Sequence, residues 1–188
     1  MASILRFDNW QNSDGTSIAT TDASGNISFA GDATFTGDVT GFSAGKILQV
    51  VTAHKNDVFT TTSGTFVDIP GLSVTITPTS ATSKVLVLGN VSTFGSPSSG
   101  VRLRVLRDST PISVGSSGSS LQVSDAGPYN LNSTNSAAMA YLDSPSTTSA
   151  TVYKWQIEGV PGQTVGVNRD NNSYYSSASN IVVMEVSA

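Results

Sequence analysis

The sequence predicts an all-β protein in which an antiparallel β-sandwich follows a short extended segment. From about Gly45 onward the chain contains twelve runs that are rich in β-branched residues and that predict about ten strands. Clusters of Ser, Gly, Pro and Asn separate these runs, and no stretch repeats its apolar residues with a helical period. These observations favour a sandwich or barrel of antiparallel strands.

Each run reads as a strand, or part of one, bounded by turn residues. In chain order the runs are KILQVVTA, DVFTTT, TFVDIPG, LSVTITP, KVLVLGNVSTF, VRLRVLRD, TPISVG, SSLQV, SAAMAYLD, SATVYKWQIEG, QTVGVNR and NIVVMEV. Prolines stand at the run ends, where a missing backbone N–H removes no sheet hydrogen bond: Pro70, Pro78, Pro111, Pro145 and Pro161. We therefore expect strands to end at these residues.

Alternation within the runs predicts which side chains form the core. Val85 and Val87 share the apolar phase of one run, and Trp155 and Ile157 share that of another. We expect all four side chains to be buried between the two sheets of a single sandwich.

Two arginines occupy one face of a predicted strand. Arg102 and Arg104 alternate with Leu103 and Val105, so both guanidinium groups should point away from the core. An ordinary solvated outer face explains this pattern. The alternative is a recognition surface, because the guanidinium fork suits carboxylate and phosphate groups.

The loop DNNSYYSSASN, from Asp170 to Asn180, is among the most polar parts of the second half of the chain. Tyr174 and Tyr175 in this loop offer aromatic planes that could stack on sugar rings or on protein. They are candidate recognition residues. The alternative is that they cover one end of the sandwich or a seam between subunits.

The segment GNISFAGDATFTGDVTG, from Gly25 to Gly41, alternates strictly and repeats Gly-Asp after six residues. Five of its apolar residues stand at odd positions: Ile27, Phe29, Ala33, Phe35 and Val39. Burying these side chains within one chain offsets too little of the backbone entropy lost on ordering. The pattern therefore predicts a stalk that joins strands from several chains.

The predicted contacts of this stalk are Ile27, Phe29, Phe35 and Val39. We accordingly divide the chain into an extended attachment segment, residues 1–44, and a head domain, residues 45–188. The alternative is an ordinary hairpin over residues 25–41 that packs on the head domain.

Charge and composition argue against several classes of protein. The net charge of -4 is unfavourable for nucleic-acid binding, which depends on Lys and Arg. The chain has no cysteine, and therefore no disulfide or thiolate metal site. No apolar run approaches the roughly 20 residues of a membrane helix, and the first residues do not resemble a signal peptide. We expect no membrane insertion.

No catalytic constellation can be assembled from the sequence. His54 is the only histidine and no nucleophile elbow accompanies it. Glu158 and Glu185 end strand-like runs. Glu185 shares a face with Ile181 and Val183, which suggests either that a partner group holds it or that it lies at an interface. We expect no enzyme activity, no cofactor and no metal.

The segments LRFDNWQNSDGT and DASGNISFAGDATFTGDVTG resemble the opening of short fibre-like and other virion structural proteins of tailed phages, especially marine and cyanobacterial ones. The stretch that begins ILQVVTAHKNDVFTTTSG is similar to the head domains that often follow. The resemblance implies a homotrimer with a slender intertwined N-terminal part and a jelly-roll-like head. No long shaft is present, and the station on the virion stays open.

The resulting functional prediction is a structural component of a phage virion that assembles in the host cytoplasm. It is either a trimeric fibre or tip, or a capsid decoration protein of the cement or head-fibre kind. Leu5, Phe7 and Trp10 are candidate anchors on a capsid or tail protein, and the head could contact a host-surface glycan. The alternative is a free-standing carbohydrate-binding module, which predicts a monomer.

Overall fold

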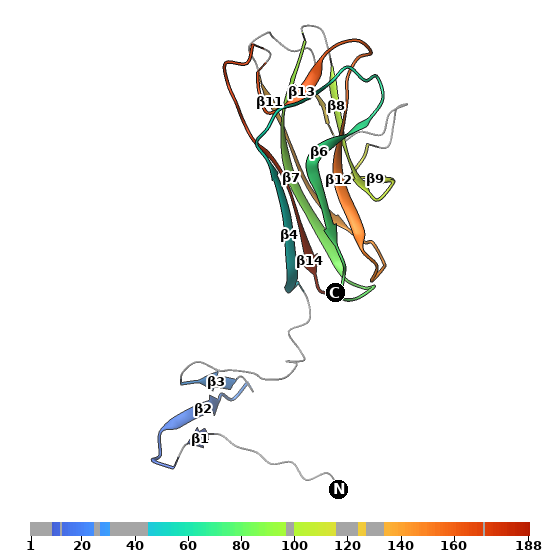
Figure 1. The fold of residues 1–188 in the computed structure, drawn as a ribbon. Helices are drawn as coiled ribbons and strands as arrows, with labels where there is room; N and C mark the ends of the chain where they lie inside the picture. The colour runs from blue at the N-terminus through green and yellow to red at the C-terminus, as the bar shows by residue number, and fades with distance from the viewer. Residues whose placement is uncertain are drawn as a thin grey trace. The chain divides into compact units, whose positions relative to one another are not determined.

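The computed structural model describes residues 9–11, 13–24, 27–30, 45–96, 100–115, 124–126, 134–170 and 172–188. The chain divides into two compact units, Met1–Phe42 and Ser43–Ala188. Every strand pair in the described residues is antiparallel, which confirms the predicted all-β fold class (Figure 1). The described part of the chain contains no helix that could serve as a membrane span.

The N-terminal unit contains a small three-stranded sheet. Its strands are β1 (Asn9–Gln11), β2 (Ser17–Thr21) and β3 (Ile27–Phe29), in the order β1-β2-β3. Two Asp side chains form the turns between them, since Asp14 accepts from the backbone N–H of Thr16 and Asp22 from that of Ser24. The segment Ile27–Phe29 is thus paired within its own chain along one edge.

The C-terminal unit is a sandwich of two sheets. Its strands are β4 (Ile47–Lys55), β5 (Phe59–Thr61), β6 (Val67–Ile76), β7 (Lys84–Gly95), β8 (Val101–Arg107), β9 (Thr110–Ile112), β10 (Ser124–Ala126), β11 (Asn135–Asp143), β12 (Thr151–Glu158), β13 (Val165–Val167) and β14 (Ser179–Val186). The five-stranded sheet has the order β10-β8-β12-β6, with β9 beside β8. The six-stranded sheet has the order β4-β14-β7-β13-β5, with β11 along the other edge of β7.

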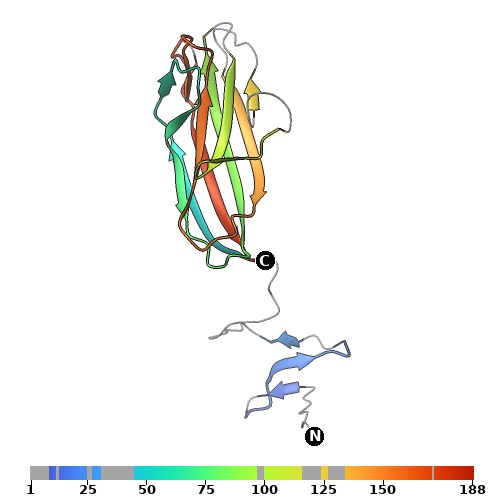
Figure 2. The ribbon, with the colours of Figure 1, turned by 90° about the vertical axis from the view of Figure 1, so that its right-hand side faces the viewer.

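Successive long strands alternate between the two sheets. The chain passes from β4 in the six-stranded sheet to β6 in the five-stranded sheet, and β7, β8, β11, β12 and β14 continue the alternation. Because each crossing joins opposite sheets, no single sheet is a simple meander, as in jelly-roll sandwiches. Figure 2 shows the long strands running side by side along the unit.

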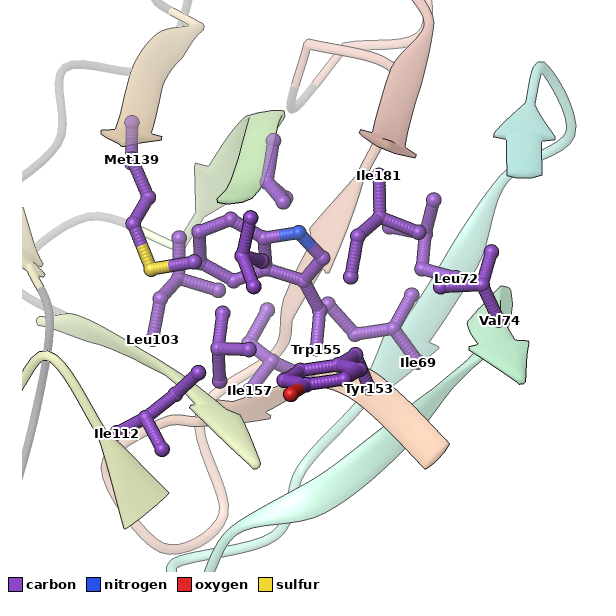
Figure 3. Close-up of a cluster of buried hydrophobic side chains, with 14 of the residues drawn as sticks. Ile69, Leu72, Val74, Leu103, Ile112, Met139, Tyr153, Trp155, Ile157 and Ile181 are labelled. Atoms are coloured by element: carbon purple, nitrogen blue, oxygen red, sulfur yellow. The ribbon is translucent and has the colours of Figure 1, made fainter. Parts of the chain in front are cut away.

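The core between the sheets contains the residues that the alternation predicts. The side chains of Val85, Val87, Trp155 and Ile157 are fully buried, which confirms that prediction. Figure 3 shows the Trp155 indole in the middle of the cluster, with Leu103 and Met139 on one side and Ile181 on the other.

The prediction that strands end at Pro70 and Pro111 is wrong. Pro70 lies inside β6, and Pro111 lies inside β9. The pairing of β12 with β6 shifts between Lys154 and Gln156, and Gly71 has a positive φ of 84° beside Pro70. A bulge therefore absorbs the proline, which an edge strand such as β6 tolerates because its outer N–H groups need no strand partner.

One buried carboxylate lies at the end of the sandwich that contains the last residues of β14. Glu185 of β14 is fully buried, and it accepts hydrogen bonds from the Gln49 side chain at 2.6 Å and from both the N–H and the hydroxyl of Thr79 at 2.7 Å. The groups that hold Glu185 therefore belong to its own chain. These bonds tie the loop between β6 and β7 to β14.

Candidate functional site

The N-terminal sheet brings a predicted anchor residue, Trp10, together with two predicted stalk contacts, Ile27 and Phe29. Trp10 pairs with Ala19, and Ala19 pairs with Phe29, so the three side chains form one row across β1, β2 and β3. Ile27 lies two residues before Phe29 on the same face. We call Trp10, Ala19, Ile27 and Phe29 the N-terminal apolar row.

The large members of the N-terminal apolar row are exposed. Trp10 is 56% exposed, Ile27 61% and Phe29 44%, whereas the small Ala19 is only 5% exposed. A three-stranded sheet normally needs a covered apolar face to be stable. The predicted residues Leu5, Phe7, Phe35 and Val39 lie outside the described residues.

The two predicted recognition tyrosines project from the loop between β13 and β14. Tyr174 is 77% exposed and Tyr175 68%. The loop is internally bonded, because the N–H of Tyr175 donates to Asp170 Oδ1 at 3.1 Å and the N–H of Asp170 donates to the Tyr175 carbonyl at 3.2 Å. Both exposed rings thus lie next to a backbone pair that is hydrogen-bonded to Asp170.

A buried polar network anchors the base of this loop. The Asn168 amide donates to the carbonyls of Lys55 and Asp57, both at 2.9 Å, and accepts from the Ser179 hydroxyl at 2.6 Å. Asn168 adopts a positive φ of 70°, a conformation that Asn tolerates better than most residues. Sequence reasoning missed this network, because nothing in the pattern around Asn168 distinguishes it from other loop asparagines.

The predicted arginines lie on the outer face of the five-stranded sheet. Leu103 and Val105 are buried while Arg102 and Arg104 are half-buried, which confirms the predicted register. Arg102 forms an ion pair with Glu158 at 3.0 Å.

The other arginine belongs to a wider network on this face. Arg104 donates to Gln156 at 2.7 Å, and its guanidinium lies 4.1 Å from the ring centroid of Phe66. Gln156 in turn donates to Asp68 at 2.6 Å, and Lys154 donates to the same carboxylate at 2.7 Å. These own-chain partners favour an ordinary outer face, and recognition by the arginines stays a prediction.

The three residues weighed for catalysis have different surroundings. His54 is exposed on β4, Glu158 is held by Arg102, and Glu185 is buried among neutral hydrogen-bond donors. In the described ranges, no group of three or more His, Asp or Glu residues is placed to hold a metal ion.

The point where the chain enters β4 and the tyrosine loop lie at opposite ends of β14. The Gly45 N–H donates to the Ser187 carbonyl at 3.3 Å, and the Ser187 N–H donates to the Lys46 carbonyl at 2.9 Å. The chain therefore enters β4 beside the end of β14, whereas the tyrosine loop leads into the start of β14 at Ser179. Figure 1 shows the C-terminus at the end of the unit where β4 begins.

The architecture defines the C-terminal unit as an antiparallel, jelly-roll-like β-sandwich. No protein-family model matches the chain, and no curated protein matches it. Similar solved structures include one of the infectious bursal disease virus Gt strain, which is 12% identical with a TM-score of 0.44 over 89% of this chain and 46% of that chain.

Two further structures are similar. The VP2 subviral particle of infectious bursal disease virus is 11% identical, with a TM-score of 0.44 over 86% of this chain and 44% of that one. The tripod from the baseplate of bacteriophage Tuc2009 is 14% identical, with a TM-score of 0.23 over 90% of this chain and 84% of that one. The chain thus spans less than half the length of the bursal disease virus chains.

Proposed function

We propose that this chain is a non-enzymatic structural component of a virion. It acts as a homotrimer, either as a fibre or tip or as a capsid decoration protein. Residues 1–44 attach it to another virion protein and residues 45–188 form the outward-facing head. The observation that carries the proposal is the exposure of Trp10, Ile27 and Phe29 in the N-terminal apolar row.

The exposed N-terminal apolar row leaves burial free energy unused. Each large apolar side chain that stays in water forgoes about 1.5 to 3 kcal/mol of burial free energy. The small N-terminal sheet offers Ala19 as its only buried apolar residue within the described residues. Three chains that share the row around one axis bury these side chains against one another, and strand edges of neighbouring chains can then pair.

The two ends of the head support the same role. One end receives the attachment segment at Gly45, and the other displays Tyr174 and Tyr175 on a loop held by Asn168. An adhesive or decorating module needs this polarity, because one end must be fixed to the particle while the other faces its surroundings. A host-surface glycan is a suitable contact for the tyrosine rings.

Gold labelling at Ala188 tests the virion role in phage particles purified from cells that produce the labelled chain. The proposal expects label at regular positions, either over the capsid or on the tail, and the position decides between decoration and fibre. Purified particles without label, with all labelled chain in the soluble fraction, would contradict it.

A second candidate is a free-standing carbohydrate-binding module. The exposure of Tyr174 and Tyr175 favours it, since their aromatic planes are free to stack on sugar rings. This reading leaves the exposed N-terminal apolar row without a role. It also expects a monomer, which separates it from the virion role.

A further inference from the structure

Asn168 joins the tyrosine loop to the turn between β4 and β5. Its side-chain amide donates to the carbonyls of Lys55 and Asp57, both at 2.9 Å. Its backbone carbonyl accepts from the N–H of Ser177, in the tyrosine loop, at 3.1 Å. The turn and the loop are therefore held against the same buried residue.

The turn between β4 and β5 places two exposed side chains beside Asn168. The Asp57 side chain is 74% exposed and Val58 is 44% exposed. Val167, which precedes Asn168, pairs with Phe59, which follows Val58. Val58 is therefore a neighbour of Asn168 across the same pair of strands.

The tyrosine rings start a short distance from this turn. Ser179 pairs with Lys55, and from this pair the chain runs two residues forward to Asp57 and four residues back to Tyr175. Both segments run in the same direction, because the strands are antiparallel. At about 3.3 Å a residue and about 5 Å between strands, the backbones of Asp57 and Tyr175 come within about 10 Å of each other. We call these residues the tip surface: Asp57, Val58, Tyr174 and Tyr175.

Asp57 offers a carboxylate that is held from one side. The Lys55 ammonium donates to its two oxygens at 2.9 and 2.8 Å, and the Lys55 side chain is buried. The hydrogen bond from Lys55 holds the pKa of Asp57 below its usual range. A carboxylate has about four lone-pair sites, so Asp57 can accept further hydrogen bonds from the solvent side.

The charges around the tip surface cancel. Lys55 and Asp57 form an ion pair, and Arg169 and Asp170 are adjacent in the sequence. Asp170 is fully buried, and the half-buried Arg169 guanidinium lies 4.8 Å from the ring centroid of Phe94. The tip surface therefore carries no excess positive charge that would attract an acidic ligand.

Exposed aromatic planes beside a hydrogen-bond acceptor suit a sugar. The apolar side of a sugar ring stacks on tyrosine, and its hydroxyl groups donate to a carboxylate. An acidic sugar would bring a second carboxylate close to Asp57, and like charges repel. An apolar partner would cover Asp57 without giving it hydrogen bonds.

We propose that the tip surface binds a neutral glycan. Tyr174 and Tyr175 stack on its sugar rings, Asp57 accepts hydrogen bonds from its hydroxyl groups, and Val58 adds an apolar contact. This inference rests on the glycan contact in the proposed function. It names the class of glycan and two residues outside the tyrosine loop, and it holds for any number of chains.

A glycan array tests the class of ligand with the full chain. The array carries neutral oligosaccharides of glucose, galactose, mannose and N-acetylglucosamine, each beside a counterpart that bears a uronic or sialic acid. The proposal expects the chain to bind the neutral member of a pair at least about tenfold more tightly than the acidic member.

Two substitutions of Asp57 test its role. Asp57→Asn should weaken binding of the preferred neutral glycan at least about tenfold, because hydrogen bonds to a charged acceptor are the stronger ones. Asp57→Glu keeps an anionic partner for Lys55 but moves the carboxylate by one methylene, and it should weaken binding at least about threefold. Thermal melting checks that both variants are folded.

Asp68→Asn is the matched control. Asp68 is also an exposed carboxylate that forms an ion pair with a lysine, Lys154, but it lies on the outer face of the five-stranded sheet. This variant should bind as wild type does. Wild-type affinity in both Asp57 variants, preference for the acidic member of a pair, or binding to no glycan would each overturn the inference.

Sedimentation of the same samples separates this inference from the proposed function. A trimer that binds no glycan overturns the glycan site and leaves the virion role standing. A monomer that binds a neutral glycan through Asp57 overturns the homotrimer and leaves the glycan site standing.

Discussion

Gly89 of β7 lies against the indole of Trp155 across the sandwich. A Cβ atom on Gly89 would stand 2.7 Å from Nε1 of Trp155 and 3.1 Å from the Asn180 carbonyl oxygen. The largest buried side chain of the core therefore uses the space left by a residue without a side chain. The contact couples the middle of β7 to the middle of β12.

Gly89→Ala should destabilise the head. The added methyl group must displace Trp155 or the backbone of β14, which costs on the order of 1 to 3 kcal/mol in a packed core. Chemical denaturation followed by tryptophan fluorescence measures the change. Gly115→Ala is the matched control, because no atom of the described residues lies within 4 Å of the added Cβ there. Equal stability of the two variants would contradict the close packing.

The hydrogen-bonded environment of Glu185 predicts that the folded protein loses stability in acid. Burial tends to raise its pKa, but hydrogen bonds from Gln49, Thr79 and Ser83 outweigh burial and hold the pKa at about 2, below the ordinary 4.5. A lowered pKa means that the folded state favours the ionised group. This stabilisation is complete above about pH 4.5 and is lost as the pH falls through about 2, with a magnitude on the order of 3 kcal/mol.

Glu185→Gln isolates this effect. The variant should be less stable than wild type at pH 7, because an amide cannot accept all the hydrogen bonds that the carboxylate accepts. Its free energy of unfolding should also fall less steeply between pH 4.5 and 2. Urea titrations at several pH values measure both quantities, and parallel curves for the two proteins would show that Glu185 does not carry the effect.

The predicted contact site for a glycan is the exposed pair Tyr174 and Tyr175. Tyr174→Ala combined with Tyr175→Ala should abolish binding to a glycan array without changing the melting temperature, because both rings are exposed. The control pair Ser73→Ala with Thr75→Ala alters exposed residues on the outer face of β6 and should bind as wild type does. Unchanged binding by the tyrosine variant would assign glycan contact to another surface.

Alternation made the core and the register of β8 predictable from the sequence, because a one-residue shift would bury Arg102 and Arg104. The bulge at Pro70 was not predictable, since it depends on the neighbouring strand β12. The pairing of Trp10 with Phe29 through Ala19 likewise depends on a register that no local pattern encodes.

The outer sides of β7 and β14 left a sequence signal that alternation alone did not interpret. The runs KVLVL and IVVMEV carry apolar residues in both phases, and their outer residues Leu86, Leu88, Val182 and Met184 are half-buried. The sequence alone does not show that these runs lie side by side. The pairing of β14 with β7 supplies that information.

The stalk prediction is tested by substituting Phe29→Asp together with Phe35→Asp. The charges should dissociate the trimer and leave the head folded, because the head has its own core around Trp155. Native mass spectrometry reports the assembly, and thermal melting reports the head. If the variant kept the oligomeric mass of wild type, the segment from Gly25 to Gly41 would be no part of the interchain contact.

The most direct measurement is the mass of the intact wild-type chain in solution by sedimentation equilibrium. The proposed function predicts a single species with the mass of three chains of 19.4 kDa each. A species with the mass of one 19.4 kDa chain at micromolar concentration would contradict the homotrimer and favour the carbohydrate-binding module.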